Sequence, residues 1–112
     1  MGLSSAAESD DAAFRALAEP RRREILRLVA ADERSAGDIA GEFAVTRSAI
    51  SQHLTVLREA GLVSERREGT RRLYRARPEG LAAFRRLLEE MWSASLDSAR
   101  ILAERDSDGI DR

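Results

Sequence analysis

The sequence predicts a mainly α-helical fold with a small β-hairpin, made of five helices and two strands. Hydrophobic residues recur every three or four positions through most of the chain, as in helices that bury one face. Two short strand-like runs separated by a glycine turn interrupt this pattern between residues 62 and 77. With 112 residues, 43% of them hydrophobic, the chain suits one compact domain over residues 10–104, with disordered tails at 1–9 and 105–112.

Three helices are predicted in the first 45 residues. The first spans about residues 11–18, and the second opens at Pro20, where the missing N–H is harmless, and runs to about residue 31. A third helix begins at Ser35, which forms a capping box with Asp38, and ends at a short turn. We expect this third helix to position the helix that follows.

The fourth predicted helix carries the most informative pattern. Thr46 is a good N-cap, and Gly61 tolerates the left-handed turn that ends a helix. Ile50, Leu54 and Leu57 fall on one apolar stripe. The opposite stripe and its flanks are polar and consist of Arg47, Ser48, Ser51, Gln52, Thr55 and Arg58. A short helix, a turn and such a second helix form a helix-turn-helix, which places the polar stripe in a DNA groove.

A basic hairpin follows this helix. Residues 62–67 and 72–77 are predicted strands around a turn at 68–70. Four arginines lie near its tip: Arg66, Arg67, Arg71 and Arg72. A basic ribbon beside a reading helix, a wing, is placed to grip the DNA backbone or enter the minor groove. The alternative is an edge hairpin kept soluble by charge, but its position beside the polar helix favours DNA contact.

The charge distribution supports a nucleic-acid partner although the net charge is only −1. Residues 44–86 hold 10 arginines against 4 acidic residues, a net charge of +6, and the remainder has a net charge of −7. One side of the protein therefore attracts phosphate while the rest repels it, which favours correct docking.

A long last helix is predicted from Pro78 to about residue 104. Its hydrophobic residues form two neighbouring stripes, more than one small core can hide. We expect one stripe to cover the domain and the other to meet a second copy of the chain. The predicted dimer interface consists of Phe14, Leu17, Phe84, Leu88, Met91, Trp92, Leu96 and Ala99. The alternative is that this helix packs only along its own domain.

Composition excludes several functions. The chain has no cysteine and one histidine, so we expect no disulfide, no thiolate metal site and no cofactor. That histidine, His53, lies beside the apolar stripe and is expected to be partly buried and to fix its helix against the wing. No phosphate loop or nucleophile–base pair is present, so we predict no enzymatic activity. Without an apolar run of about 18 residues or a secretory signal, we expect a cytoplasmic protein with no membrane partner.

Three segments together resemble the ArsR/SmtB-like winged helix-turn-helix repressors: EPRRREIL, SAISQHLTVLREAGLV and GTRRLYR. The resemblance extends over residues 14–103. It implies a homodimer, built through the first and last helices, that binds a roughly palindromic operator in double-stranded DNA and represses a promoter, often its own. It also implies DNA contacts by Thr46, Arg47, Ser48, Ser51, Gln52 and Arg71.

The chain departs from the metal-sensing members of that family. Residues 35–41, where many of them carry a cysteine pair, contain no thiol, and the last helix has carboxylates but no histidine. The sequence is therefore similar to the non-metal branch, whose effector is a small molecule, a partner protein or nothing. Two alternatives stay open: a winged helix that binds another protein, and a regulator of the multidrug-resistance type, although those are usually longer.

Overall fold

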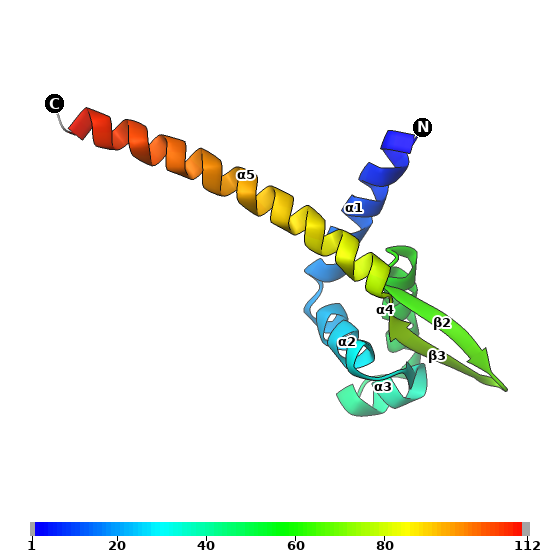
Figure 1. The fold of residues 1–112 in the computed structure, drawn as a ribbon. Coiled ribbons are helices and arrows are strands. Elements are labelled where there is room, and N and C mark those ends of the chain that lie inside the picture. Colours follow the sequence, from blue (N-terminus) through cyan, green and yellow to red (C-terminus); the bar gives the residue numbers. More distant parts are fainter. Residues whose placement is uncertain (1, 111–112) are drawn as a thin grey trace. The chain divides into compact units, whose positions relative to one another are not determined.

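The computed structural model describes the backbone of residues 2–110 and the side chains of residues 8–106. This part of the chain contains five helices and three strands (Figure 1). In chain order these are α1 (Gly2–Ala18), α2 (Pro20–Ala31), β1 (Arg34–Ser35), α3 (Ala36–Phe43), α4 (Arg47–Glu59), β2 (Val63–Glu68), β3 (Arg71–Ala76) and α5 (Pro78–Ile110). The chain separates into two compact units, residues up to 82 and residues from 83 onward, a boundary that the sequence does not predict.

The core of the first unit is built from aliphatic side chains of α2, α3, α4 and β2. The largest fully buried ones are Ile25, Val29, Ile39, Ile50, Leu54, Leu57, Leu62 and Val63. Burying each of them contributes about 1.5–3 kcal/mol to folding. The predicted apolar stripe of α4 is confirmed, because its three residues have no exposed surface. This stripe fixes the rotation of α4, so the opposite, polar face of the helix points to solvent.

The ends of α3 and α4 are set by local hydrogen bonds, as the sequence predicts. The Ser35 hydroxyl accepts the Asp38 N–H at 3.1 Å while the Asp38 carboxylate accepts the Ser35 N–H, which completes the capping box. These bonds to Ser35 lower the pKa of Asp38. The Thr46 hydroxyl caps α4 by accepting the Ala49 N–H at 3.1 Å. After α4, Gly61 adopts a φ of +77°, the left-handed conformation that suits glycine.

The wing, residues 63–76, belongs to a three-stranded antiparallel sheet with the order β1–β3–β2. β2 and β3 pair along their lengths and leave Gly69 and Thr70 as the turn. The short strand β1 pairs with the other edge of β3 and thereby joins the start of α3 to the wing. The sequence does not predict β1, because two residues are too few to show an alternating pattern.

The terminal helices differ from the sequence prediction. α1 begins at Gly2 and α5 continues to Ile110, so the described parts of segments 1–9 and 105–112 are helical where disordered tails are predicted. Neither segment holds a proline that would stop a helix. Met1 and residues 111–112 lie outside the described residues.

The face that α1 buries also differs from the prediction. Phe14, Leu17 and Ala18 form the expected apolar face, but the first two are half-buried and Ala18 is exposed. The buried residues are Ala13 and Ala16, whose small side chains let α1 lie close to α2 and α4.

A glycine allows close approach between the end of α4 and the start of α5 within the first unit. A Cβ at Gly80 would overlap the carbonyl oxygen of Gly61 and lie 3.0 Å from its carbonyl carbon. Because backbone atoms cannot swing aside, we expect Gly80→Ala to lower the free energy of unfolding by about 1–3 kcal/mol. The matched control is Gly41→Ala in α3, where a Cβ meets no atom within 4 Å.

We expect Gly41→Ala to raise the free energy of unfolding by about 0.5–1 kcal/mol, because alanine favours a helix interior more than glycine does. Urea unfolding of both variants measures the two effects. A Gly80→Ala protein as stable as the Gly41→Ala protein would contradict the close approach.

Candidate DNA-binding site

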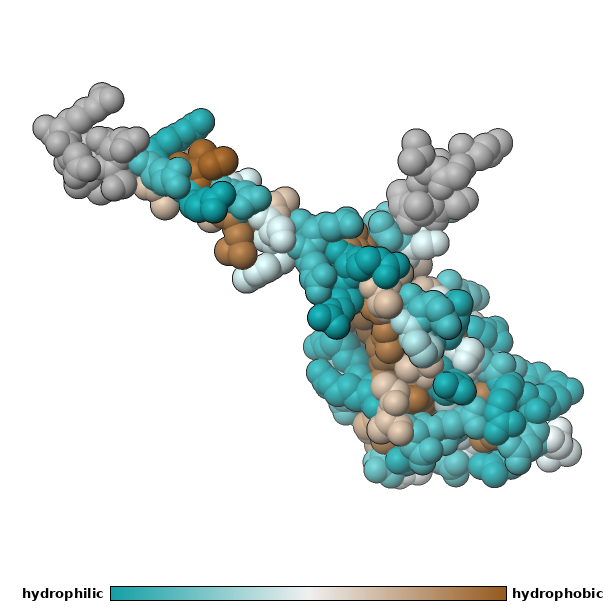
Figure 2. Space-filling view, viewed as in Figure 1, coloured by the Kyte–Doolittle hydropathy of each residue, from teal (hydrophilic) through white to brown (hydrophobic). Residues whose placement is uncertain are grey.

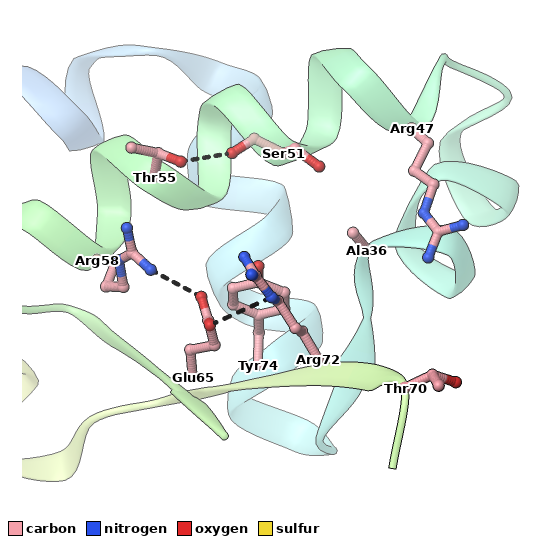
Figure 3. Close-up of a pocket in the computed structure, with 9 residues that line it drawn as sticks. All are labelled: Ala36, Arg47, Ser51, Thr55, Arg58, Glu65, Thr70, Arg72 and Tyr74. Carbon is pink, nitrogen blue, oxygen red and sulfur yellow. Dashed lines mark hydrogen bonds and ion pairs between the residues drawn. The ribbon is translucent and has the colours of Figure 1, made fainter. Parts of the chain in front are cut away.

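The polar face of α4 is accessible along its whole length. Ser48, Ser51, Gln52 and Thr55 are all exposed, opposite the buried stripe. The Thr55 hydroxyl donates to the Ser51 carbonyl oxygen at 3.0 Å, so its proton is already used within the helix (Figure 3). Gln52 is exposed and forms no hydrogen bond with its side chain among the described residues, so its amide is available to another molecule.

A pocket of about 310 Å³ lies between α4 and the wing (Figure 3). It is lined by Ala36, Arg47, Ser51, Thr55, Arg58, Glu65, Thr70, Arg72 and Tyr74. Five of these residues belong to the predicted DNA-contacting set, and they come from two elements that the sequence cannot bring together by itself. The helix and the hairpin thus form one continuous polar surface.

Arg58 and Arg72, two of the predicted DNA-contacting residues, face each other across this pocket and share one acidic partner. The Arg58 Nη1 donates to Glu65 Oε2 at 2.7 Å, and the Arg72 Nε lies 3.8 Å from Glu65 Oε1. Glu65 therefore bridges α4 and the wing.

Arg66 is the most firmly held arginine of the wing. It donates to both carboxylate oxygens of Glu33, at 2.8 and 2.7 Å, and also to Glu68 at 2.8 Å. This forked contact lowers the pKa of Glu33 and raises the pKa of Arg66. Arg66 thus joins the wing to the residue that precedes β1, a structural contact that the sequence does not predict.

The other predicted arginines are more available. Arg71 lies 3.3 Å from the Asp38 carboxylate, and more than half of each side chain is exposed. Such an exposed pair is worth about 0–1 kcal/mol and opens readily. Arg47 and Arg67 are exposed and form no ion pair with any residue that the structure describes. Of the predicted arginines, Arg47 and Arg67 can therefore bind a phosphate without giving up an ion pair, and Arg71 gives up only a weak one.

Three acidic residues, Glu33, Asp38 and Glu65, pair with predicted arginines of the site, and the sequence does not predict these pairs. Glu33 and Arg66 lie 33 residues apart, as do Asp38 and Arg71, so no spacing rule connects them. Only the pairing of β1 with β3 brings these segments together. For Glu65 one indication is present in the sequence, because it is the one acidic residue of the predicted strand 62–67 and arginines follow it there.

His53 is half-buried, as predicted, but its expected contact with the wing is wrong. Its Nδ1 lies 3.4 Å from the Nη1 of Arg22 in α2. Arg22 also donates to the carbonyl oxygens of Ala16, at 2.6 Å, and Arg15, so it ties the end of α1 to α4. Burial first, and then the charge of Arg22, lower the pKa of His53.

This lowered pKa makes part of the stability depend on pH. In the unfolded chain His53 titrates near 6.5, so below that pH the unfolded state takes up a proton that the folded state resists. We expect the melting temperature to fall between pH 7.5 and pH 5.5, and to fall less in His53→Gln. The carboxyl groups of Glu33 and Asp38, whose pKa values are lowered, change the stability only at pH values below this range. An equal fall in both proteins, measured by circular dichroism, would contradict this role.

The second unit consists of the part of α5 from residue 83 onward, and it exposes large hydrophobic side chains (Figure 2). Trp92 is 67% exposed, and Leu88, Met91 and Leu96 are 43–51% exposed. Ala99 is also exposed, whereas Phe84 is half-buried. Exposed apolar patches of this kind are typical of interaction surfaces.

Neither a metal cluster nor a membrane span is found in the described part of the chain. Among those residues, no three histidine, aspartate or glutamate side chains converge so as to hold a metal ion. None of the helices described is long and apolar enough to cross a bilayer.

Comparison with known proteins agrees with this geometry. The sequence model of one protein family, described as bacterial regulatory proteins of the arsR family, matches residues 19–65 of this chain. The HTH-type transcriptional regulator Rv2034 of Mycobacterium tuberculosis is 41% identical over 100 residues, which are 89% of this chain and 94% of that protein. The transcriptional repressor SdpR of Bacillus subtilis is 41% identical over 56 residues, 50% of this chain and 62% of the repressor.

A solved structure supports the fold. The homodimeric winged helix-turn-helix DNA-binding domain of a possible ArsR-family regulator from Mycobacterium bovis is 32% identical, with a TM-score of 0.67 over 86% of this chain and 89% of that one. This likeness confirms the predicted winged helix-turn-helix. The relatives are named as regulators and not as enzymes, in agreement with the sequence prediction. The chain belongs to the ArsR family of bacterial helix-turn-helix regulatory proteins.

Proposed function

We propose that this ArsR-family protein is a dimeric repressor that binds an inverted-repeat operator and occludes a promoter, such as its own. The observation that carries the proposal is the continuous polar surface of α4 and the wing, with Arg47, Arg67 and Arg71 accessible on it. Repression is supported by the likeness to a protein named as a transcriptional repressor.

In this proposal α4 enters the major groove. Gln52 pairs with adenine and Arg47 with guanine or a phosphate, because their side chains match the edges of these bases. The wing lies along the backbone or minor groove. The residues proposed to contact DNA are Thr46, Arg47, Ser48, Ser51, Gln52, Thr55, Arg58, Arg66, Arg67, Arg71 and Arg72. The short ion pairs of Arg58 and Arg66, at 2.7 Å, make their contribution smaller than that of Arg47, which has no ion pair with a described residue, or Arg71, whose pair is exposed and 3.3 Å long.

The proposed dimer uses the exposed apolar residues of α5, above all Trp92, together with Phe14 and Leu17 of α1. Two facts support this: Trp92 is two-thirds exposed, and a structural relative is named as homodimeric. A twofold axis would place two α4 helices roughly 34 Å apart, one turn of duplex, and would require an inverted repeat.

We propose that the protein acts without thiolate metal sensing. The sequence contains no cysteine, so the thiolate ligands that select soft metal ions are absent from it. Any effector is then a small molecule or a partner protein.

Selection of bound sequences from random DNA, with the protein's own promoter as a test case, examines this function. We expect an inverted repeat with half-sites about one helical turn apart. A parallel titration with random duplex at low salt separates a DNA-binding protein from a protein-interaction module, because phosphate contacts alone support weak binding there. Absence of binding to every duplex, even at low salt, would overturn the proposal.

A further inference from the structure

The pocket between α4 and the wing contains one acidic residue among the side chains that line it, Glu65 of β2 (Figure 3). Arg47, Arg58 and Arg72 line the same pocket. In the proposed function this surface faces DNA, and a carboxylate there repels phosphate. Glu65 therefore weakens the attraction between this surface and DNA. We expect it to contribute something else to DNA recognition that offsets this loss of affinity.

The contacts of Glu65 divide its carboxylate between two elements. One oxygen accepts from Arg58 of α4 at 2.7 Å, and the other lies 3.8 Å from the Nε of Arg72 in β3. The side chain of Glu65 is 22% exposed, against 46% for Arg58 and 56% for Arg72. The Glu65 side chain is thus less exposed than either arginine and is paired with both of them.

Tyr74 is the cross-strand neighbour of Glu65 on β3. Glu65 and Tyr74 are direct partners across β2 and β3, and Tyr74 is buried. Burial, the charge of Glu65 and a hydrogen bond between the two side chains raise the pKa of the Tyr74 hydroxyl. Glu65 thus lies beside a buried side chain and is paired with two arginines, which limits its movement.

An arginine that is already paired with a carboxylate gains less free energy when it binds a phosphate. Arg58 must give up a short, charge-assisted hydrogen bond of 2.7 Å before it makes another, and Arg72 must leave an ion pair of 3.8 Å. Random DNA offers only phosphates to these arginines, whereas a cognate site also offers base contacts to α4. Breaking the ion pairs of Arg58 and Arg72 therefore lowers the affinity for random DNA more than the affinity for a cognate site.

We propose that Glu65 is a specificity-determining positioning residue, which restrains Arg58 and Arg72 so that they do not bind the phosphates of non-cognate DNA. This inference rests on the proposed function. Glu65 acts through the two arginines and needs no contact of its own with a base.

The variant Glu65→Gln tests the proposal, because it removes the charge and keeps the size of the side chain. We expect the affinity for random duplex at low salt to rise several-fold. The dependence of log affinity on log salt should steepen by about 0.9 for each arginine that reaches a phosphate. The operator should gain less, so the ratio of operator affinity to random-DNA affinity falls.

The matched control is Glu59→Gln. Glu59 is exposed on α4 and does not line the pocket, and the substitution changes the net charge by the same amount. We expect it to leave the salt dependence and the affinity ratio unchanged. A second test adds Arg58→Gln and Arg72→Gln to Glu65→Gln, which should abolish the additional salt dependence.

Two results would overturn the inference. The first is a Glu65→Gln protein with the same salt dependence and affinity ratio as Glu59→Gln. The second is an additional salt dependence that remains after both arginines are replaced. Loss of the melting transition in Glu65→Gln would also overturn it, because Glu65 would then be a structural residue. If the wild-type protein binds no duplex at low salt, the proposed function itself fails; if it binds and Glu65→Gln behaves in the same way, only this inference fails.

Discussion

Replacing Trp92 with glutamate is expected to convert the proposed dimer into monomers and to lower operator affinity by about two to four orders of magnitude. Trp92 is 67% exposed and is the largest side chain of the exposed α5 surface. Loss of a tryptophan at the centre of an interface costs about 2–4 kcal/mol, and a twofold axis makes each substitution count twice. The affinity falls because two half-sites no longer bind one linked pair of helices.

Light scattering and operator titration measure the two effects of Trp92→Glu. The control is Ser93→Glu, which adds the same charge to the neighbouring exposed position of α5, on another side of the helix. We expect this control to remain dimeric and to bind the operator normally. A Trp92→Glu protein that stays dimeric would show that the interface lies elsewhere.

Replacing Gln52 with alanine is expected to cost about 1–3 kcal/mol of operator binding and to relax the preference for one base pair in each half-site. Gln52 is exposed on the polar face of α4, whose rotation is set by the buried stripe of Ile50, Leu54 and Leu57. The substitution removes a donor and an acceptor without disturbing the core. Binding to random DNA should change little, because phosphates carry most of that affinity.

The variant Arg71→Ala provides the contrast. Arg71 is exposed on the wing and held only by an exposed ion pair with Asp38. We expect it to weaken operator and random DNA alike and to flatten the salt dependence by about 0.9. Titrations of both variants against both DNAs distinguish the two roles. Equal losses on specific and random DNA for both proteins would remove Gln52 as a reading residue.

The parts of the fold that the sequence predicts correctly are those with local causes. The capping box of Ser35 and Asp38, the cap at Thr46 and the glycine turn at Gly61 each depend on a few neighbouring residues. The apolar stripe of α4 follows from the period of the helix alone. Together these features fix which face of α4 is exposed, and hence which residues become candidates for reading DNA.

The parts that the sequence does not predict depend on contacts between distant segments. The forked pair of Glu33 and Arg66 spans 33 residues, and it appears only once β1 has paired with β3. His53 contacts Arg22 of α2 because α1, α2 and α4 meet there, although the helical wheel also allows a contact with the wing. In α1 the small residues Ala13 and Ala16 are buried instead of Phe14, because close packing of helices outweighs side-chain hydrophobicity there.

These long-range ion pairs change how the predicted arginines are ranked. From the sequence, the arginines of the wing are equivalent members of a basic tip. In the structure Arg66 has two carboxylate partners, Arg71 has one exposed partner, and Arg67 has no ion pair with any described residue. We therefore expect the wing to contact DNA mainly through Arg67 and Arg71.

The affinity for an operator lengthened at its centre shows directly whether two α4 helices bind as a linked pair. The proposed function requires two α4 helices, held in one dimer, to reach two major grooves on the same side of a duplex. Inserting about five base pairs turns one half-site to the opposite side of the helix. We predict that this insertion reduces the affinity to that of random DNA; an unchanged affinity would contradict the paired-helix geometry.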